Sequence, residues 1–147
     1  MNRMPFIICE TTGDWAAILG PLLPPSISLI ETRRLDEVWE RLQGATAAIV
    51  ALELTLERAD EIQAALRRLG DEFPQTVPMV FSTRSLAAWE EVVREAGAVH
   101  FVSSTRRIGE VVDLVRRRAA SAIGEALHGN EAPSLEDQIL GSLPWGD

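Results

Sequence analysis

Three polar side chains stand directly after apolar runs of strand length, where an α/β protein places its chemistry. Glu53 follows the apolar run 47–52, and Glu10 and Ser82 stand in the same way after two other runs. In an open α/β sheet, ligands bind in the crevice at the carboxyl ends of the strands. We therefore expect Glu10, Glu53 and Ser82 to share a crevice.

The two carboxylates set the range of chemistry at that crevice. Glu10 and Glu53 together are at most a weak Mg²⁺ site, because Mg²⁺ accepts one or two carboxylates and completes its shell with water. We expect no metal and no other cofactor. Cys9, which precedes Glu10, is interpreted as a buried small hydrophobic residue rather than a nucleophile.

Five strand-like runs alternate with five segments of helical periodicity. The runs are 5–9, 26–31, 47–52, 77–81 and 99–102. Apolar residues at helical spacing follow each run, over 15–22, 35–42, 59–69, 86–96 and 108–123. Each crossover is long enough for a right-handed βαβ unit, so the alternation predicts a parallel sheet with helices on both faces. Glycines close three of these helices, at Gly44, Gly70 and Gly97.

Composition narrows the class of protein. The 147 residues, 46% hydrophobic and 24% charged, predict one domain over 4–127, with a linker and tail over 128–147. The net charge of −8 argues against direct nucleic-acid binding and against an anionic membrane surface. No apolar stretch reaches the ~20 residues of a membrane span and no signal peptide is visible, so we expect a cytoplasmic protein. All 14 basic residues are Arg, and the single cysteine excludes an intrachain disulfide.

Three short pieces of the sequence resemble the receiver domain of bacterial response regulators in two-component phosphorelays. Residues 50–56 (Val-Ala-Leu-Glu-Leu-Thr-Leu) are similar to its apolar run and Asp-Leu-x-Leu. Residues 77–83 resemble its fourth strand, which ends in a hydroxyl residue. Residues 97–104 resemble its Gly-Ala, short strand with an aromatic residue, and Lys-Pro. The resemblance implies a flavodoxin-like doubly wound sheet of five parallel strands in the order 2-1-3-4-5.

The resemblance also implies phosphoryl transfer to an Asp at the end of the third strand, helped by Mg²⁺, a hydroxyl and a Lys. Glu53 stands at the acceptor position, and only one acid, Glu10, remains after the first strand. Ser82 keeps the hydroxyl and Phe101 matches the aromatic switch residue, but Ser104 stands at the Lys position. We therefore interpret the chain as a degenerate pseudo-receiver and expect no enzyme activity.

The leading functional hypothesis is a phosphorylation-independent signalling or scaffolding module that works by protein–protein contact. The resemblance places that contact on the face made by the fourth helix, fifth strand and fifth helix, where receivers also form homodimers. Trp89, Arg94 and Arg107 lie on or next to these elements. One alternative is a residual phosphoacceptor or small-ligand switch at the crevice of Glu10, Glu53 and Ser82. Another is the sensor part of a transcription regulator.

Two further features keep alternatives open. Glu53 either mimics a phosphorylated Asp, with −1 in place of nearly −2, or is a polar loop residue without a switch role. The tail has a helix cap, acids in its first turn and a Gly stop. It either docks in a partner's groove, packs on its own domain or is disordered. The apolar tail residues are Leu135, Ile139, Leu140, Leu143 and Trp145.

Overall fold

A sheet of five parallel strands in the order β2-β1-β3-β4-β5 forms the centre of the protein, which confirms the predicted topology. The computed structural model describes residues 3–130, and the side chains of residues 3–121. The strands are β1 (Met4–Cys9), β2 (Ile27–Thr32), β3 (Ala48–Glu53), β4 (Thr76–Phe81) and β5 (His100–Val102).

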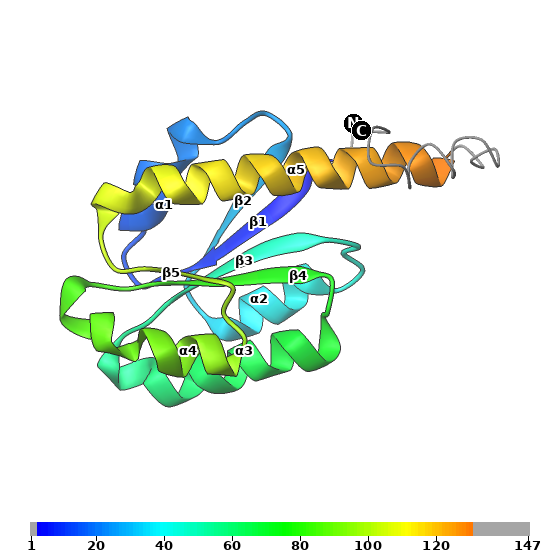
Figure 1. Cartoon of the computed structure of the whole chain (residues 1–147). Coiled ribbons are helices and arrows are strands. Elements are labelled where there is room, and N and C mark those ends of the chain that lie inside the picture. Colours follow the sequence, from blue (N-terminus) through cyan, green and yellow to red (C-terminus); the bar gives the residue numbers. More distant parts are fainter. Residues whose placement is uncertain (1–2, 131–147) are drawn as a thin grey trace.

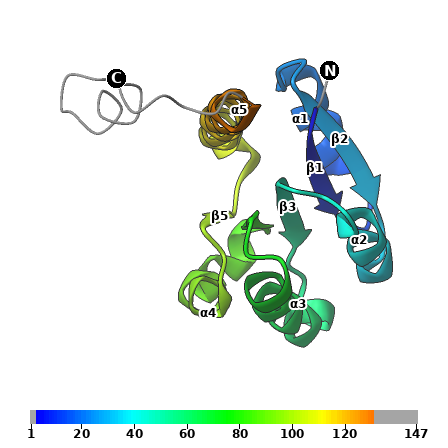
Figure 2. The same cartoon turned by 90° about the vertical axis from the view of Figure 1, so that its right-hand side faces the viewer.

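Helices cover both faces of the sheet. The α-helices are α1 (Asp14–Leu19), α2 (Leu35–Leu42), α3 (Ala59–Glu72), α4 (Glu90–Ala96) and α5 (Ile108–Asn130). α1 and α5 lie on one face, and α2, α3 and α4 lie on the other (Figures 1 and 2). Four 3₁₀ turns complete the connections: η1 (Gly20–Leu22), η2 (Leu56–Arg58), η3 (Arg84–Trp89) and η4 (Thr105–Arg107).

The core has one apolar layer on each side of the sheet, which explains why the strands are unbroken apolar runs. Successive strand side chains point to opposite faces. Phe6 and Ile8 of β1 therefore pack with the α1–α5 layer, and Ile7 and Cys9 pack with the α2–α4 layer. All four are essentially inaccessible to solvent. A central parallel strand covered on both faces must be apolar along its whole length.

Two of the three predicted glycine stops are confirmed and one is wrong. Gly44 and Gly97 follow α2 and α4 with φ of +77° and +129°, the left-handed region that glycine adopts without a Cβ penalty. Gly70 lies inside α3, which continues to Glu72 and ends where Phe73 N–H donates to the Leu69 carbonyl. A helical glycine only weakens a helix, so the long amphipathic pattern of α3 outweighed it.

Two other boundaries differ from the expected ones. The predicted helix 86–96 is divided into η3 and α4, and the Thr83 and Ser85 hydroxyls hydrogen-bond to one another at 2.7 Å at the start of η3. α5 continues past the expected end at residue 123 and past residue 127, and it runs out along the top of the molecule (Figure 1). Within residues 3–130, no helix combines the length and apolar character needed to cross a bilayer.

Candidate functional site

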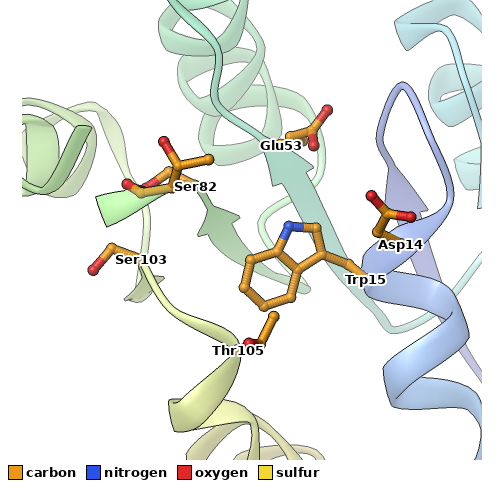
Figure 3. Close-up of a pocket in the computed structure, with 7 residues that line it drawn as sticks. Asp14, Trp15, Glu53, Ser82, Ser103 and Thr105 are labelled. Carbon is orange, nitrogen blue, oxygen red and sulfur yellow. Dashed lines mark hydrogen bonds between the residues drawn. The ribbon is translucent and has the colours of Figure 1, made fainter. Parts of the chain in front are cut away.

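The carboxyl ends of β3, β4 and β5 open on a pocket of about 250 Å³ beside the start of α1. The strand register places the polar ends together: Glu53 pairs with Phe81, and the N–H of Ser82 donates to the Val102 carbonyl at 2.8 Å. In a sheet of this order, the strand connections reverse direction between β1 and β3, where a crevice forms. The pocket is lined by Asp14, Trp15, Glu53, Ser82, Thr83, Ser103 and Thr105 (Figure 3).

Glu53 is the last residue of β3, and its side chain is tied to the loop that follows β1. Its Oε1 accepts hydrogen bonds from both the backbone N–H and the hydroxyl of Thr11, each at 3.0 Å. Neither Arg84 nor Arg106 forms an ion pair with it, and no other residue with a described side chain does. The carboxylate is thus held beside the pocket by neutral donors.

Glu10 is fully buried and acts as the cap of α1. Its Oε1 accepts from the N–H of Trp15 at 2.9 Å and its Oε2 accepts from the N–H of Ala16 at 2.8 Å. Gly13, at φ +89°, supplies the left-handed turn that reverses the loop toward Glu10. These bonds satisfy N–H groups that have no partner within a helix, and a carboxylate is favoured at that end.

The capping role separates Glu10 from the pocket that the sequence predicts it to share. Its side chain does not line the pocket, since both of its oxygens face the first turn of α1. A Mg²⁺ ion needs accessible oxygen ligands in octahedral geometry. Glu10 does not fit the role of a ligand, and the described residues contain no group of three His, Cys, Asp or Glu placed to hold a metal.

Trp15 is one of five pocket residues that sequence reasoning missed, with Asp14, Thr83, Ser103 and Thr105. Its spacing with Ile18 and Leu19 indicates only an apolar helix face. Its indole packs on Phe81 with ring centroids 4.6 Å apart and an interplanar angle of 34°, and the residue is 8% exposed. In Figure 3 the ring lies in the centre of the pocket, with the polar side chains around it. Helical side chains point back toward the helix N-terminus, so an aromatic residue in the first turn of α1 reaches the carboxyl edge of the sheet.

The hydroxyls at the strand ends have distinct positions. Ser82 is buried, lines the pocket and donates to the Thr83 carbonyl at 3.1 Å. After β5, Ser103 and Thr105 line the pocket and Ser104 does not. Ser104 is extended and its Oγ accepts from the N–H of Arg106 at 3.2 Å, which caps η4. Alternate residues of an extended segment point in opposite directions. The neighbours Ser103 and Thr105 therefore line the pocket, whereas Ser104, at the position that the motif spacing predicts, points away from it.

The candidate switch and partner residues are divided between the core and the surface. Phe101 is 5% exposed and packs within the α2–α4 layer, and Trp89 is half-buried against the same layer. Arg94 is exposed and is held by Glu90 at 2.8 Å and by the Val99 carbonyl at 3.0 Å. Arg107 is exposed. The tail residues Leu135, Ile139, Leu140, Leu143 and Trp145 lie outside the described part of the chain.

His100 of β5 lies half-buried between α4 and α5. Its Nε2 is buried without a hydrogen-bond partner and is 3.7 Å from Oε2 of Glu110. Burial lowers the pKa of His100 below its ordinary 6.5, and Arg94 and Arg107 act in the same direction. Glu110 and Glu90 oppose that shift without cancelling it.

Comparison with solved structures identifies the architecture. A response regulator from Thermotoga maritima superposes with a TM-score of 0.66 at 18% sequence identity, over 82% of this chain and 99% of that one. The chain has the receiver fold. A CheY-like protein (tadZ) from Pseudomonas aeruginosa PAO1 shows the receiver fold as well, with a TM-score of 0.65 at 18% identity over 80% of this chain and 93% of that one. No family model and no curated protein sequence matches the chain.

Proposed function

We propose that this receiver-fold chain is a phosphorylation-independent signalling or scaffolding module that acts through protein–protein contact. The observation that carries the proposal is the state of Glu53, which replaces the phosphoacceptor and whose Oε1 already accepts two hydrogen bonds from Thr11. Receiver folds serve signalling, so a receiver fold that has lost its phosphoacceptor chemistry retains its surfaces as the means of action.

The chemistry of the pocket supports the same proposal. A transferred phosphoryl group needs cations to neutralise its oxygens. The described lining residues include Asp14 and Glu53 and no basic side chain, and the sequence contains no Lys. Glu10 is committed to α1. An incoming phosphoryl group would therefore meet negative charge without a counter-charge.

The surface proposed for contact is the α4–β5–α5 face. Val99, which lies between α4 and β5, is a large apolar side chain that is 49% exposed there. Arg94, which pairs with Glu90, also binds the Val99 carbonyl, Arg107 is exposed just before α5, and the half-buried Trp89 adds an aromatic edge. Exposed apolar groups bordered by charge are typical of interaction sites, so this face suits a protein partner or a second copy of the chain. The apolar tail is proposed as a second contact.

Intact-mass measurement after incubation with a small acyl phosphate tests the loss of phosphoryl chemistry. We expect no gain of a phosphoryl group with Mg²⁺ present, in the native chain or in Glu53→Gln. A gain in the native chain that Glu53→Gln abolishes would instead support the alternative, a residual phosphoacceptor at Glu53 and Ser82. That alternative is kept because both residues line a real pocket.

The contact surface is tested separately by light scattering and by capture of partners with the full chain. Val99→Glu places a charge in the proposed interface and should abolish self-association or partner capture. Ile18→Glu is the matched control, because Ile18 is 37% exposed on α1, which is not part of the proposed face. Equal effects of the two variants would reject the α4–β5–α5 face. Deletion of residues 134–147 should reduce capture and leave the melting temperature unchanged if the tail docks in trans.

A further inference from the structure

The pocket at the carboxyl edge is acidic and rich in hydrogen-bond acceptors. Two carboxylates, Asp14 and Glu53, and four hydroxyl side chains line it, and none of the described lining residues is basic. Arg84 and Arg106 belong to the neighbouring turns η3 and η4, yet neither lines the pocket. A ligand that enters must supply donors and positive charge.

Both carboxylates retain the capacity to bind such a ligand. Thr11 occupies Oε1 of Glu53, and Oε2 accepts no hydrogen bond from any residue with a described side chain. Asp14 is exposed, and within the same part of the chain its carboxylate forms neither an ion pair nor a hydrogen bond. Asp14 and Glu53 therefore each offer free carboxylate oxygen to a cation in the pocket.

The Trp15 indole at the centre of the pocket favours a planar cation. The indole of Trp15, packed on Phe81 and 8% exposed, lies in the centre of the lining (Figure 3). A guanidinium group is planar, is weakly hydrated, stacks on aromatic rings and binds carboxylates with two parallel hydrogen bonds. The volume of about 250 Å³ is below the usual range of about 300–1,000 Å³ for drug-sized ligands, so it suits a single side-chain-sized group.

We propose that this pocket binds an alkyl-guanidinium group, stacked on Trp15 and paired with Glu53 and Asp14. The group comes either from a free small molecule or from an Arg side chain of a protein partner. The inference goes beyond the proposed function because it assigns a ligand class to the pocket, and it holds whether or not the α4–β5–α5 face binds a partner.

The test is a titration of the ¹⁵N-labelled full chain with N-propylguanidinium, followed by the indole N–H resonance of Trp15. Trp15→Phe assigns that resonance among the four Trp of the sequence. We expect a saturable displacement that weakens with added salt. A capped Gly-Arg-Gly peptide provides the second arm: tighter binding of the peptide indicates a partner's Arg, and tighter binding of the free guanidinium indicates a small molecule.

Matched controls make the outcome decisive. The double variant Asp14→Asn with Glu53→Gln should raise the dissociation constant about tenfold, the loss expected for two solvent-exposed ion pairs. Glu53→Gln retains an oxygen acceptor for Thr11, so the loop is preserved. The pair Asp113→Asn with Glu57→Gln changes the net charge equally at exposed positions outside the pocket and should bind like the native chain.

Several results would overturn the proposal. N-propylurea is the neutral isostere and should cause no displacement, so equal binding of urea and guanidinium would remove the role of charge. An unchanged affinity in the Asp14→Asn and Glu53→Gln double variant would show that these two carboxylates do not bind the guanidinium. The same displacement with inorganic phosphate or with Mg²⁺ alone would assign the pocket to a different ligand class. The absence of any saturable change would remove the site.

Discussion

Thr11 holds Glu53 with two hydrogen bonds to the same carboxylate oxygen, each 3.0 Å long. One bond comes from a backbone N–H and the other from a hydroxyl, so they can be separated by mutation. Because Glu53 ends β3 and Thr11 follows β1, this contact closes the gap between two adjacent strands at the edge where the fold places its site.

Replacement of Thr11 by Val removes the hydroxyl bond and keeps the backbone bond. We expect the free energy of unfolding to fall by about 1 kcal/mol, the usual net value of one hydrogen bond. Urea denaturation measures this change. Thr46→Val is the control, because Thr46 is an exposed loop residue whose hydroxyl bonds to no residue with a described side chain, and it should change stability by less than about 0.5 kcal/mol. Equal changes in the two variants would contradict the assigned bond.

Replacement of Glu10 by Ala leaves the N–H groups of Trp15 and Ala16 without their acceptor in a buried place. Loss of a cap and of buried partners predicts a decrease of about 2–4 kcal/mol in the free energy of unfolding. Glu10→Gln should lie between, because its amide retains one acceptor oxygen. Glu57→Ala, an exposed acid at the start of η2, should be nearly neutral. A neutral Glu10→Ala variant would show that Glu10 does not cap α1.

Gly70→Ala and Gly97→Ala should have opposite effects on thermal unfolding. Gly70 lies within α3, and a Cβ there meets no atom within 4 Å, so Ala should stabilise by about 0.5–1 kcal/mol. Gly97 has φ +129°, and its Cβ would approach the Leu66 carbonyl oxygen to 3.4 Å, so Ala should destabilise by at least about 1 kcal/mol. Two variants that both stabilise would contradict the strained backbone at Gly97.

His100 should make stability depend on pH near neutrality. Its pKa in the folded chain is below 6.5, so the unfolded chain binds the proton more readily. Its contribution is therefore fully present above pH 6.5 and is lost as the pH falls from 6.5 through the lowered pKa. Protonation places a charge at a buried Nε2 with Glu110 and Glu90 on one side and Arg94 and Arg107 on the other. Denaturation of His100→Gln between pH 7 and 5 should give a flatter curve than the native chain, and parallel curves would refute the role of His100.

Much of the fold could be predicted because its signals are local and repeated. Each buried strand is an apolar run, and each helix has one apolar stripe, so the alternation alone indicates a parallel sheet. Gly70 shows where local signals fail: the same residue type ends a helix at Gly97 and lies inside one at position 70. Backbone conformation and the packing of α3 decide between the two outcomes, and the neighbouring residues in the sequence predict neither of them.

The site was less predictable, because which residues line it depends on where each side chain points and not only on the order of residues along the chain. The positions of Glu53 and Ser82 at the pocket follow from their strand ends. The sequence could not tell that Glu10 faces inward onto α1, nor that Ser103 lies at the pocket in place of Ser104. Trp15 has a weak signal, its place in the first turn of the first helix, but a helix pattern records only that it is apolar.

The packing of Trp15 on Phe81 joins the pocket to the hydrophobic core. Working sites keep like charges close together and hold open, hydrated space, and both cost stability. Here Glu10 caps α1, Glu53 accepts two hydrogen bonds from Thr11, and the Trp15 indole packs between Phe81 and the pocket. The carboxyl edge of the sheet therefore meets the hydrophobic core on one side and the acidic pocket on the other, so a substitution at Trp15 should change both the stability of the fold and the shape of the pocket.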